Sequence, residues 1–226
     1  MSRVFAISGS SRMERGRTDL LLRAFLKGME GAGAEAEVVY ASRLHVSPCT
    51  GEFHCWRDTP GECYIHDDMQ LLYPRMRVAD TWVLGTPMYI PLPGELQNIL
   101  NRLCPLIEPK LATRGGRTRA RLRDDVRTKR LALVATSGWW EMGNLGTVVR
   151  IAEELAKDCS IEFSGALLRP HSSAMTRSGE LTEGGRRVLE AAEVAGKQLE
   201  ERGRIDPRVL RTVSRPLMTR RDYYAL

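Results

Sequence analysis

The 226-residue sequence lacks the long apolar runs of membrane proteins. No stretch approaches the roughly 18 apolar residues of a membrane-spanning helix, and the opening MSRVFAISGSS is too weakly basic and too short in apolar residues for a signal peptide. We therefore expect a cytoplasmic protein with no membrane partner. Thiols stay reduced in the cytosol, so the five cysteines are expected as metal ligands, redox groups or buried side chains, not as disulfides.

Motifs of several enzyme classes are also missing. Neither a G-x-G-x-x-G dinucleotide fingerprint nor a P-loop lysine follows the first apolar segment. No convincing carboxylate pair or catalytic triad is present. The histidines match no zinc-binding spacing; they are His45, His54, His66 and His171.

Positive charge is plentiful but concentrated. The net charge is +6, which suits an anionic ligand, and much of it lies in the stretch 110–130. This stretch contains no aromatic side chain, so we do not expect it to bind nucleic acid. We interpret it as a solvated or subunit-contacting connection.

Short β-rich segments alternate with longer amphipathic ones. Strands are expected at 3–10, 36–41, 80–89, 130–138 and 160–168, with helical patterns between and after them. This alternation predicts an α/β fold with a parallel sheet covered on both faces. We expect one domain at 1–204, with a cysteine loop at 46–68 and a basic insertion at 108–130, followed by a C-terminal tail at 205–226.

Ligands of such folds bind beyond the carboxyl ends of the strands. The first of these ends reads GSSRMERGRT, where hydroxyls, arginines and a helix start suit a phosphate dianion. The second reads TPMYIPLPG and the third TSGWWEMGN, and their aromatic and methionine side chains can pack against a flat ring. A phosphate site together with a planar ring suggests FMN.

At these residues the chain resembles the NADPH-dependent FMN reductase family, in the branch related to iron–sulfur flavoproteins. The similar segments are GSSR with RT, TPGEC with DDM, TPMY and TSGWW, spread over residues 3–168. The resemblance implies a flavodoxin-like, doubly wound five-stranded sheet of order 2-1-3-4-5. It also implies bound FMN and a homodimer or homotetramer.

The resemblance further implies a role for individual residues. Those expected to hold the phosphate are Ser10, Arg12, Arg17 and Thr18. Those expected along the isoalloxazine and ribityl groups are Pro87, Met88 and Tyr89. Those expected at the polar edge of the ring are Ser137, Gly138 and Trp139. Because the flavin carries the chemistry, no catalytic side chain is required.

The expected function is an NAD(P)H oxidoreductase that passes hydride or electrons through FMN to a flavin, a quinone or another small acceptor. The alternatives are an iron–sulfur flavoprotein and a flavodoxin-type electron carrier serving a protein partner. Carriers of the latter type are usually acidic, so the net charge of +6 counts against that alternative.

The cysteine loop PCTGEFHCWRDTPGEC resembles a four-cysteine cluster motif with one ligand missing. Glu52 stands at the second position, and a carboxylate is a poor ligand for an iron–sulfur cluster. We therefore expect no cluster; if one binds, its ligands are Cys49, Cys55 and Cys63. Zinc, a redox role for Cys55 or Cys63 and a structural loop are the alternatives. The remaining cysteines, Cys104 and Cys159, are expected to be buried on helices away from the loop.

Overall fold

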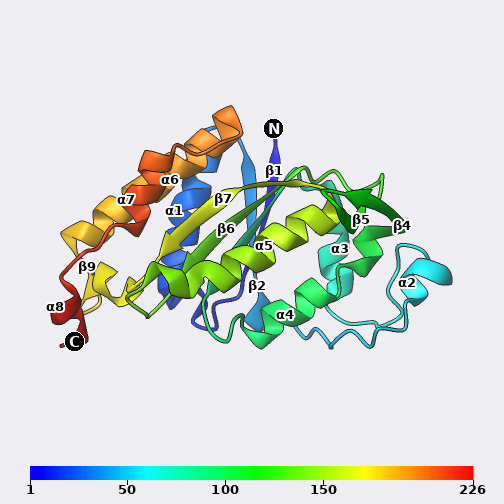
Figure 1. The fold of residues 1–226 in the computed structure, drawn as a ribbon, viewed down its shortest axis with the longest axis horizontal. Coiled ribbons are helices and arrows are strands. Elements are labelled where there is room, and N and C mark those ends of the chain that lie inside the picture. The colour runs from blue at the N-terminus through cyan, green and yellow to red at the C-terminus, as the bar shows by residue number, and fades with distance from the viewer. Residues whose placement is uncertain (226) are drawn as a thin grey trace.

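A five-stranded parallel sheet forms the centre of the molecule (Figure 1). The computed structural model describes residues 1–225. The strands are β1 (Arg3–Ser8), β2 (Glu35–Tyr40), β3 (Thr81–Pro87), β6 (Arg130–Thr136) and β7 (Glu162–Arg169). They lie in the order β2-β1-β3-β6-β7. The predicted flavodoxin-like sheet of order 2-1-3-4-5 is confirmed.

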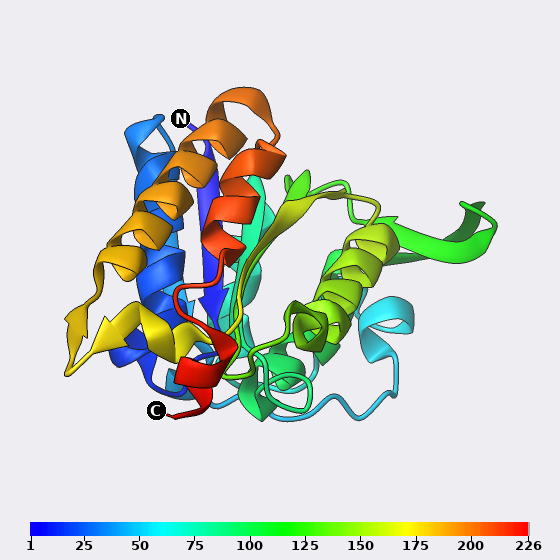
Figure 2. The same ribbon diagram turned by 60° about the vertical axis from the view of Figure 1, so that its left-hand side comes forward.

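Helices cover both faces of this sheet (Figures 1 and 2). One face carries α1 (Arg17–Gly31), α6 (Glu183–Arg202) and α7 (Pro207–Ser214). The other carries α3 (Met69–Val78), α4 (Gly94–Asn101) and α5 (Gly146–Cys159). The smaller elements are α2 (His54–Arg57), β4 (Ile107–Arg114), β5 (Arg117–Leu122), β8 (Thr176–Arg177), β9 (Glu180–Leu181) and α8 (Arg220–Tyr224). Within residues 1–225, no helix combines the length and apolar character needed to cross a membrane.

Alternate residues of each strand fill a separate core on each face. In β1, Phe5 and Ile7 pack with α3, α4 and α5, whereas Val4 and Ala6 pack with α1 and α6. Successive strand side chains point to opposite faces, so a sheet covered on both sides needs apolar residues at nearly every position. Residues 131–135 of β6 illustrate this, since each is at most 1% exposed.

The basic insertion at 108–130 contains a hairpin that the sequence pattern did not predict. Its strands β4 and β5 pair antiparallel and extend away from the sheet (Figure 2). Gly115 and Gly116 form the turn with φ of 57° and 73°, the left-handed conformation that tight hairpin turns require. Arg119 pairs with Glu154 of α5 at 2.6 Å. Part of the basic charge is therefore balanced within the chain.

Residues 205–226, expected as a polar tail, contain the helices α7 and α8. Asp206 caps α7, because its side chain accepts a hydrogen bond from the Arg208 N–H at 2.7 Å. Val213 is fully buried against the core beside α6. The last residue, Leu226, lies outside the described part of the chain.

Two glycines bring α1 and α6 into close contact. A Cβ on Gly28 would lie 1.8 Å from the carbonyl oxygen of Glu193, and one on Gly196 would lie 1.8 Å from that of Phe25. Close-packed interiors have little room to relax. A side chain at either position must therefore push the helices apart.

We predict that Gly28→Ala lowers the free energy of unfolding by about 1–3 kcal/mol through overpacking. Gly31 offers a matched control, because it lies in the same helix and its Cβ position has no neighbour within 4 Å. Gly31→Ala should be neutral or stabilising by up to about 1 kcal/mol. Urea unfolding followed by circular dichroism measures both variants, and equal effects would contradict the close-contact explanation.

Candidate functional site

Three loops meet at the carboxyl edge of the sheet, following the adjacent strands β1, β3 and β6. Backbone hydrogen bonds continue the ladder into them: the Gly9 N–H donates to Gly85 O at 2.7 Å, and the Met88 N–H donates to Thr136 O at 2.7 Å. The predicted cofactor-binding residues lie on these loops, at the end of β3 or at the start of α1: Ser10, Arg12, Arg17, Thr18, Pro87, Met88, Tyr89, Ser137, Gly138 and Trp139. The structure thus brings the three predicted groups to one edge.

The first loop leads into the start of α1, which has no side-chain cap. Within it the Met13 N–H donates to Ser10 O, and the Gly16 N–H donates to Met13 O. Helix α1 then begins at Arg17 with no side chain capping its first N–H groups, and such groups attract anions. A Cβ on Gly16 would lie 2.5 Å from Ser10 Oγ. Glycine at this position therefore lets the Ser10 hydroxyl approach the helix start.

The side chains predicted to hold phosphate differ in their contacts. The Thr18 hydroxyl is buried and bonds to Thr136 Oγ1 at 2.7 Å, so its backbone N–H is the group left for a ligand. Arg17 donates through Nη2 to Thr176 Oγ1 at 3.1 Å. Its Nε is buried and has no partner among residues 1–225. Arg12 is exposed at the rim.

The second loop is joined to the first by Tyr89. The Tyr89 hydroxyl lies 3.3 Å from Ser11 Oγ, and the side chain is 49% exposed. Met88 is partly buried and packs against the core on the α3–α5 face, while Pro87 ends β3. The loop therefore offers a fixed backbone with a partly exposed aromatic ring.

The third loop separates its two tryptophans. Ser137 is buried, and its Oγ accepts a hydrogen bond from the Trp139 N–H at 2.9 Å. Trp140 stacks on His171 with ring centroids 4.3 Å apart. By contrast, Trp139 is 63% exposed and follows the exposed Gly138. One tryptophan is thus anchored, and the other is available to a ligand or a second subunit.

Helix α8 holds this third loop in place. Tyr223 donates its hydroxyl to Gly138 O at 2.5 Å and accepts a hydrogen bond from Ser173 Oγ at 2.8 Å. Arg220 pairs with Glu141 at 2.6 Å. We call Tyr223 and Arg220 the C-terminal anchor. In the sequence, the anchor is visible only as an aromatic pair, Tyr223 and Tyr224, in an otherwise polar segment. This pattern does not indicate which residues the pair contacts.

A buried arginine lies beside the anchor and was missed from sequence. Arg169 is 0% exposed and donates to the carbonyl oxygens of Val213 at 2.7 Å and Arg215 at 2.8 Å. Its Nη2 lies 2.6 Å from His171 Nε2. The Leu217 N–H also points to that nitrogen, at 3.4 Å. We infer that Nε2 accepts both hydrogen bonds and that the ring proton is on Nδ1.

Burial sets the charges of this pair. It lowers the pKa of Arg169 to about 10. Burial and then the nearby Arg169 charge lower the pKa of His171 to about 4. At neutral pH Arg169 is charged and His171 is neutral, so the third loop lies next to one fixed positive charge.

The cysteine loop closes a small cavity of about 40 Å³. Its lining includes Cys49, Cys55, Cys63 and Cys104. The expectation that Cys104 lies away from the loop is wrong. The turn after α4 carries Cys104 back to the loop, where Trp56 Nε1 donates to Cys104 O at 2.9 Å.

The four cysteines line the cavity together. Within residues 1–225, no group of three or more His, Cys, Asp and Glu side chains is arranged to hold a single metal ion. Burial, together with neighbouring thiols, raises the pKa of Cys55 to about 11. Cys55 is therefore protonated and a poor nucleophile at neutral pH. Cys159 lies in α5, where burial raises the pKa of its thiol to about 12.

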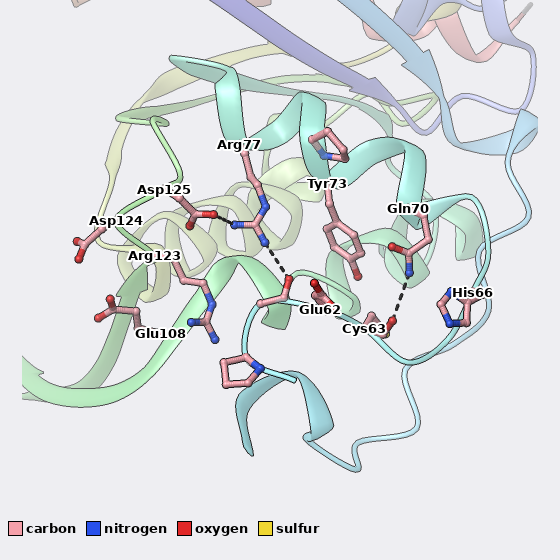
Figure 3. A pocket seen from close by; sticks show the side chains of 13 residues that line it. Glu62, Cys63, His66, Gln70, Tyr73, Arg77, Glu108, Arg123, Asp124 and Asp125 are labelled. Atoms are coloured by element: carbon pink, nitrogen blue, oxygen red, sulfur yellow. Dashed lines mark hydrogen bonds and ion pairs between the residues drawn. The ribbon is translucent and has the colours of Figure 1, made fainter. Parts of the chain in front are cut away.

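A wider hollow of about 840 Å³ lies between α3 and the base of the hairpin (Figure 3). Its lining includes Cys63, Tyr73 and Arg77. Arg77 donates to Gly61 O at 2.8 Å and pairs with Asp125. The three strand-end loops do not contribute to its lining. The hollow is therefore separate from the predicted flavin site.

The sequence matches the family model described as NADPH-dependent FMN reductase over residues 2–149. An iron–sulfur flavoprotein of Methanocaldococcus jannaschii is 34% identical over 105 residues, which cover 46% of this chain and 53% of that protein. An iron–sulfur flavoprotein of Methanosarcina thermophila is 32% identical over 101 residues, covering 44% of this chain and 51% of that protein. The match thus spans about half the length of these curated relatives.

Solved structures share the fold at low sequence identity. The NAD(P)H:quinone oxidoreductase from Methanothermobacter marburgensis superposes with a TM-score of 0.62 at 16% identity, covering 88% of this chain and 99% of that chain. An FMN-dependent NADH-azoreductase from Bacillus anthracis, in complex with FMN, superposes with a TM-score of 0.58 at 13% identity, covering 88% and 100%. At these identities the likeness concerns the fold alone.

We predict that His171 makes stability fall between about pH 6.5 and pH 4. The unfolded imidazole gains a proton near pH 6.5, whereas the folded one remains neutral down to its lowered pKa of about 4. The contribution of neutral His171 to the free energy of unfolding is therefore fully present above pH 6.5. It decreases by up to roughly 3 kcal/mol as the pH falls to about 4.

Urea unfolding at several pH values checks this expectation. His171→Asn should remove this part of the pH dependence, because asparagine tolerates the left-handed backbone at φ 38° and does not titrate. His45→Asn, at an exposed position, should leave the wild-type slope. A His171→Asn variant with the wild-type slope would refute the assignment.

Proposed function

Because the chain belongs to the NADPH-dependent FMN reductase family, we propose that it binds FMN at the three strand-end loops and acts as an NAD(P)H-dependent oxidoreductase. The proposed electron acceptor is a flavin, a quinone or another small molecule. The names of the structural neighbours, an NAD(P)H:quinone oxidoreductase and an FMN-dependent azoreductase, support this class of reaction.

The observation that carries the proposal is the uncapped start of α1 beside an unsatisfied arginine. Arg17 Nε is buried without a partner within residues 1–225, and a buried N–H without an acceptor costs about 1–3 kcal/mol. A phosphate dianion would accept from this group and from the first N–H groups of the helix. Ser10 Oγ lies close enough to the helix start to join them.

The remaining residues suit a planar ring. When bound, FMN supplies the redox chemistry, by taking hydride from a reduced nicotinamide and delivering electrons to the second substrate. Tyr89 is about half exposed and Trp139 is largely exposed. They lie on two neighbouring loops, where they can pack against the ring or its substrate. The protein's role is to bind and orient, so no acid–base side chain is assigned.

We extend the proposal to a homodimer or homotetramer. Exposed apolar side chains at the loops favour contact with a second copy, since Ile90 is 99% exposed and Trp139 is 63% exposed. Light scattering of the purified chain tests this part, and a monomer at micromolar concentration would contradict it.

An iron–sulfur flavoprotein that passes electrons to a protein partner is the alternative, and the names of the curated relatives are consistent with it. It requires a complete set of thiolate ligands. Residues 46–68 alone do not supply that set, because Glu52 stands at the second position.

Visible spectroscopy of the purified chain tests the leading proposal. Bound flavin should be released on denaturation and identified as FMN, and anaerobic NADPH or NADH should bleach its bands. Adding candidate acceptors should then restore the oxidised spectrum. A chain that neither contains FMN nor takes it up after reconstitution would refute the proposal.

We predict that Arg17→Ala weakens FMN binding by about tenfold or more, because a charge-assisted hydrogen bond contributes about 1.5–3 kcal/mol. Riboflavin lacks the phosphate, so its affinity should not change. Lys27→Ala is the matched control: it removes the same charge from an exposed position farther along α1 and should bind FMN normally. Flavin fluorescence titrations of the wild type and of both variants, with FMN and with riboflavin, measure these affinities. Equal losses for FMN and riboflavin would place Arg17 away from the phosphate.

We also predict that Tyr223→Phe weakens FMN binding by about fivefold, because losing its hydrogen bond to Gly138 O releases the third loop at a cost of about 1 kcal/mol. Tyr64→Phe is the matched control and should have little effect, since Tyr64 is 48% exposed and its hydroxyl contacts Thr50 instead of the anchor. The same titrations provide the measurement, and identical affinities for both variants would exclude a role for the anchor in binding.

A further inference from the structure

One buried arginine clamps the two ends of the cysteine loop. Arg102 is 1% exposed and donates to Ser47 O at 2.9 Å and to Ile65 O at 3.1 Å. It also forms an ion pair with Asp67 at 2.8 Å. Because these partners lie at opposite ends of the loop, the segment between them is held closed over the small cavity.

Hydrogen bonds that do not involve Arg102 connect the segment that carries Cys104 to the same loop. Trp56 Nε1 donates to Cys104 O at 2.9 Å. Arg123 bridges the two sides, donating through Nε to Pro105 O at 3.0 Å and through Nη2 to Cys55 O at 3.3 Å. These contacts fix the position of Cys104 relative to Cys55.

One residue that lines the cavity also has a hydrogen-bond donor without an acceptor among residues 1–225. Arg102 lines the cavity, and its Nε is buried with no partner among residues 1–225. A donor of this kind is expected to have an unseen acceptor, and hydrogen bonds to cluster sulfur are a regular feature of iron–sulfur sites. Four cysteines and this arginine therefore line one small cavity.

We propose that this cavity is an iron–sulfur cluster site in which Cys104 replaces the ligand absent at Glu52. The ligands of a 4Fe–4S cluster would be Cys49, Cys55, Cys63 and Cys104. Glu52 is instead hydrogen-bonded to the Thr50 hydroxyl. All four cysteines line the same cavity, and a cluster of this type takes one cysteine at each of its four irons.

Cluster binding requires the outer wall of the cavity to move. The present volume of about 40 Å³ is too small for a cluster, but Cys49, Gly51 and Phe53 in that wall are all exposed. Each thiol releases its proton to solvent as its sulfur bonds to iron. The oxidised core assembles from two ferric ions, two ferrous ions and four sulfide ions, so no other oxidant is needed.

Anaerobic reconstitution of the full chain with ferric iron, ferrous iron and sulfide tests the proposal. Iron and acid-labile sulfide should each reach about four per chain, and dithionite reduction should produce the electron paramagnetic resonance signal of a reduced cluster. Cys104→Ser should lose at least one iron per chain and the wild-type signal. Cys159→Ser removes a buried thiol outside the cavity and should behave as wild type.

Placing a fourth thiol at position 52 distinguishes a role of Cys104 as a cluster ligand from a role in packing. The double variant Glu52→Cys with Cys104→Ser should regain four irons and sulfides, a result that a purely structural role for Cys104 does not produce. If Cys104→Ser fails to fold, Cys104→Ala replaces it in both backgrounds. Circular dichroism identifies folded samples.

Three results would overturn the proposal: a wild-type chain that binds no iron with sulfide, one that binds zinc or iron alone, and a folded Cys104 variant with unchanged cluster content. The FMN content of the same samples reports on the flavin site separately. FMN without a cluster would refute this inference alone. A cluster without FMN would refute the proposed oxidoreductase alone.

Discussion

The arrangement of the carboxyl edge of the sheet depends on backbone hydrogen bonds that continue the parallel ladder past the ends of the strands. The pairs Gly9–Gly85 and Met88–Thr136 carry the register of β1, β3 and β6 into the loops that follow them. Because parallel strands end at the same edge, these bonds place the candidate phosphate loop and both aromatic loops on one rigid frame. The Thr18–Thr136 hydroxyl contact adds a side-chain link between two of them.

Two buried arginines stabilise the loops around this frame by different means. Arg102 binds a carboxylate and two carbonyl oxygens and so closes the cysteine loop. Arg169 has carbonyl and imidazole acceptors and so holds the C-terminal residues beside the third loop. Five N–H donors in a planar group let one side chain join several backbone segments.

The sheet and the long helices could be predicted from sequence because the pattern of apolar residues within each segment indicates which of its positions are buried. The apolar run 131–135, which is buried throughout, is an example. The hairpin could not, since three arginines, Arg117, Arg119 and Arg121, occupy one face of its second strand. Its short apolar face, Ala120 and Leu122, is buried only through contacts with residues distant in the chain. Strand order located the candidate site. It did not reveal that the Thr18 hydroxyl is already bonded. Cys104 reaches the cysteine loop through tertiary contacts alone, which no local spacing encodes.

The C-terminal anchor also affects the order in which the site is completed. Tyr223 and Gly138 are 85 residues apart in the chain, so a ribosome has made all five sheet strands well before Tyr223 emerges. The nascent sheet and its candidate phosphate loop can form first, while the tryptophan loop gains its hydrogen bond near the end of synthesis. A chain cut between α7 and α8 would therefore retain the fold yet lack the contact between Tyr223 and the tryptophan loop. Tight retention of a ligand would then report on an intact C-terminal segment.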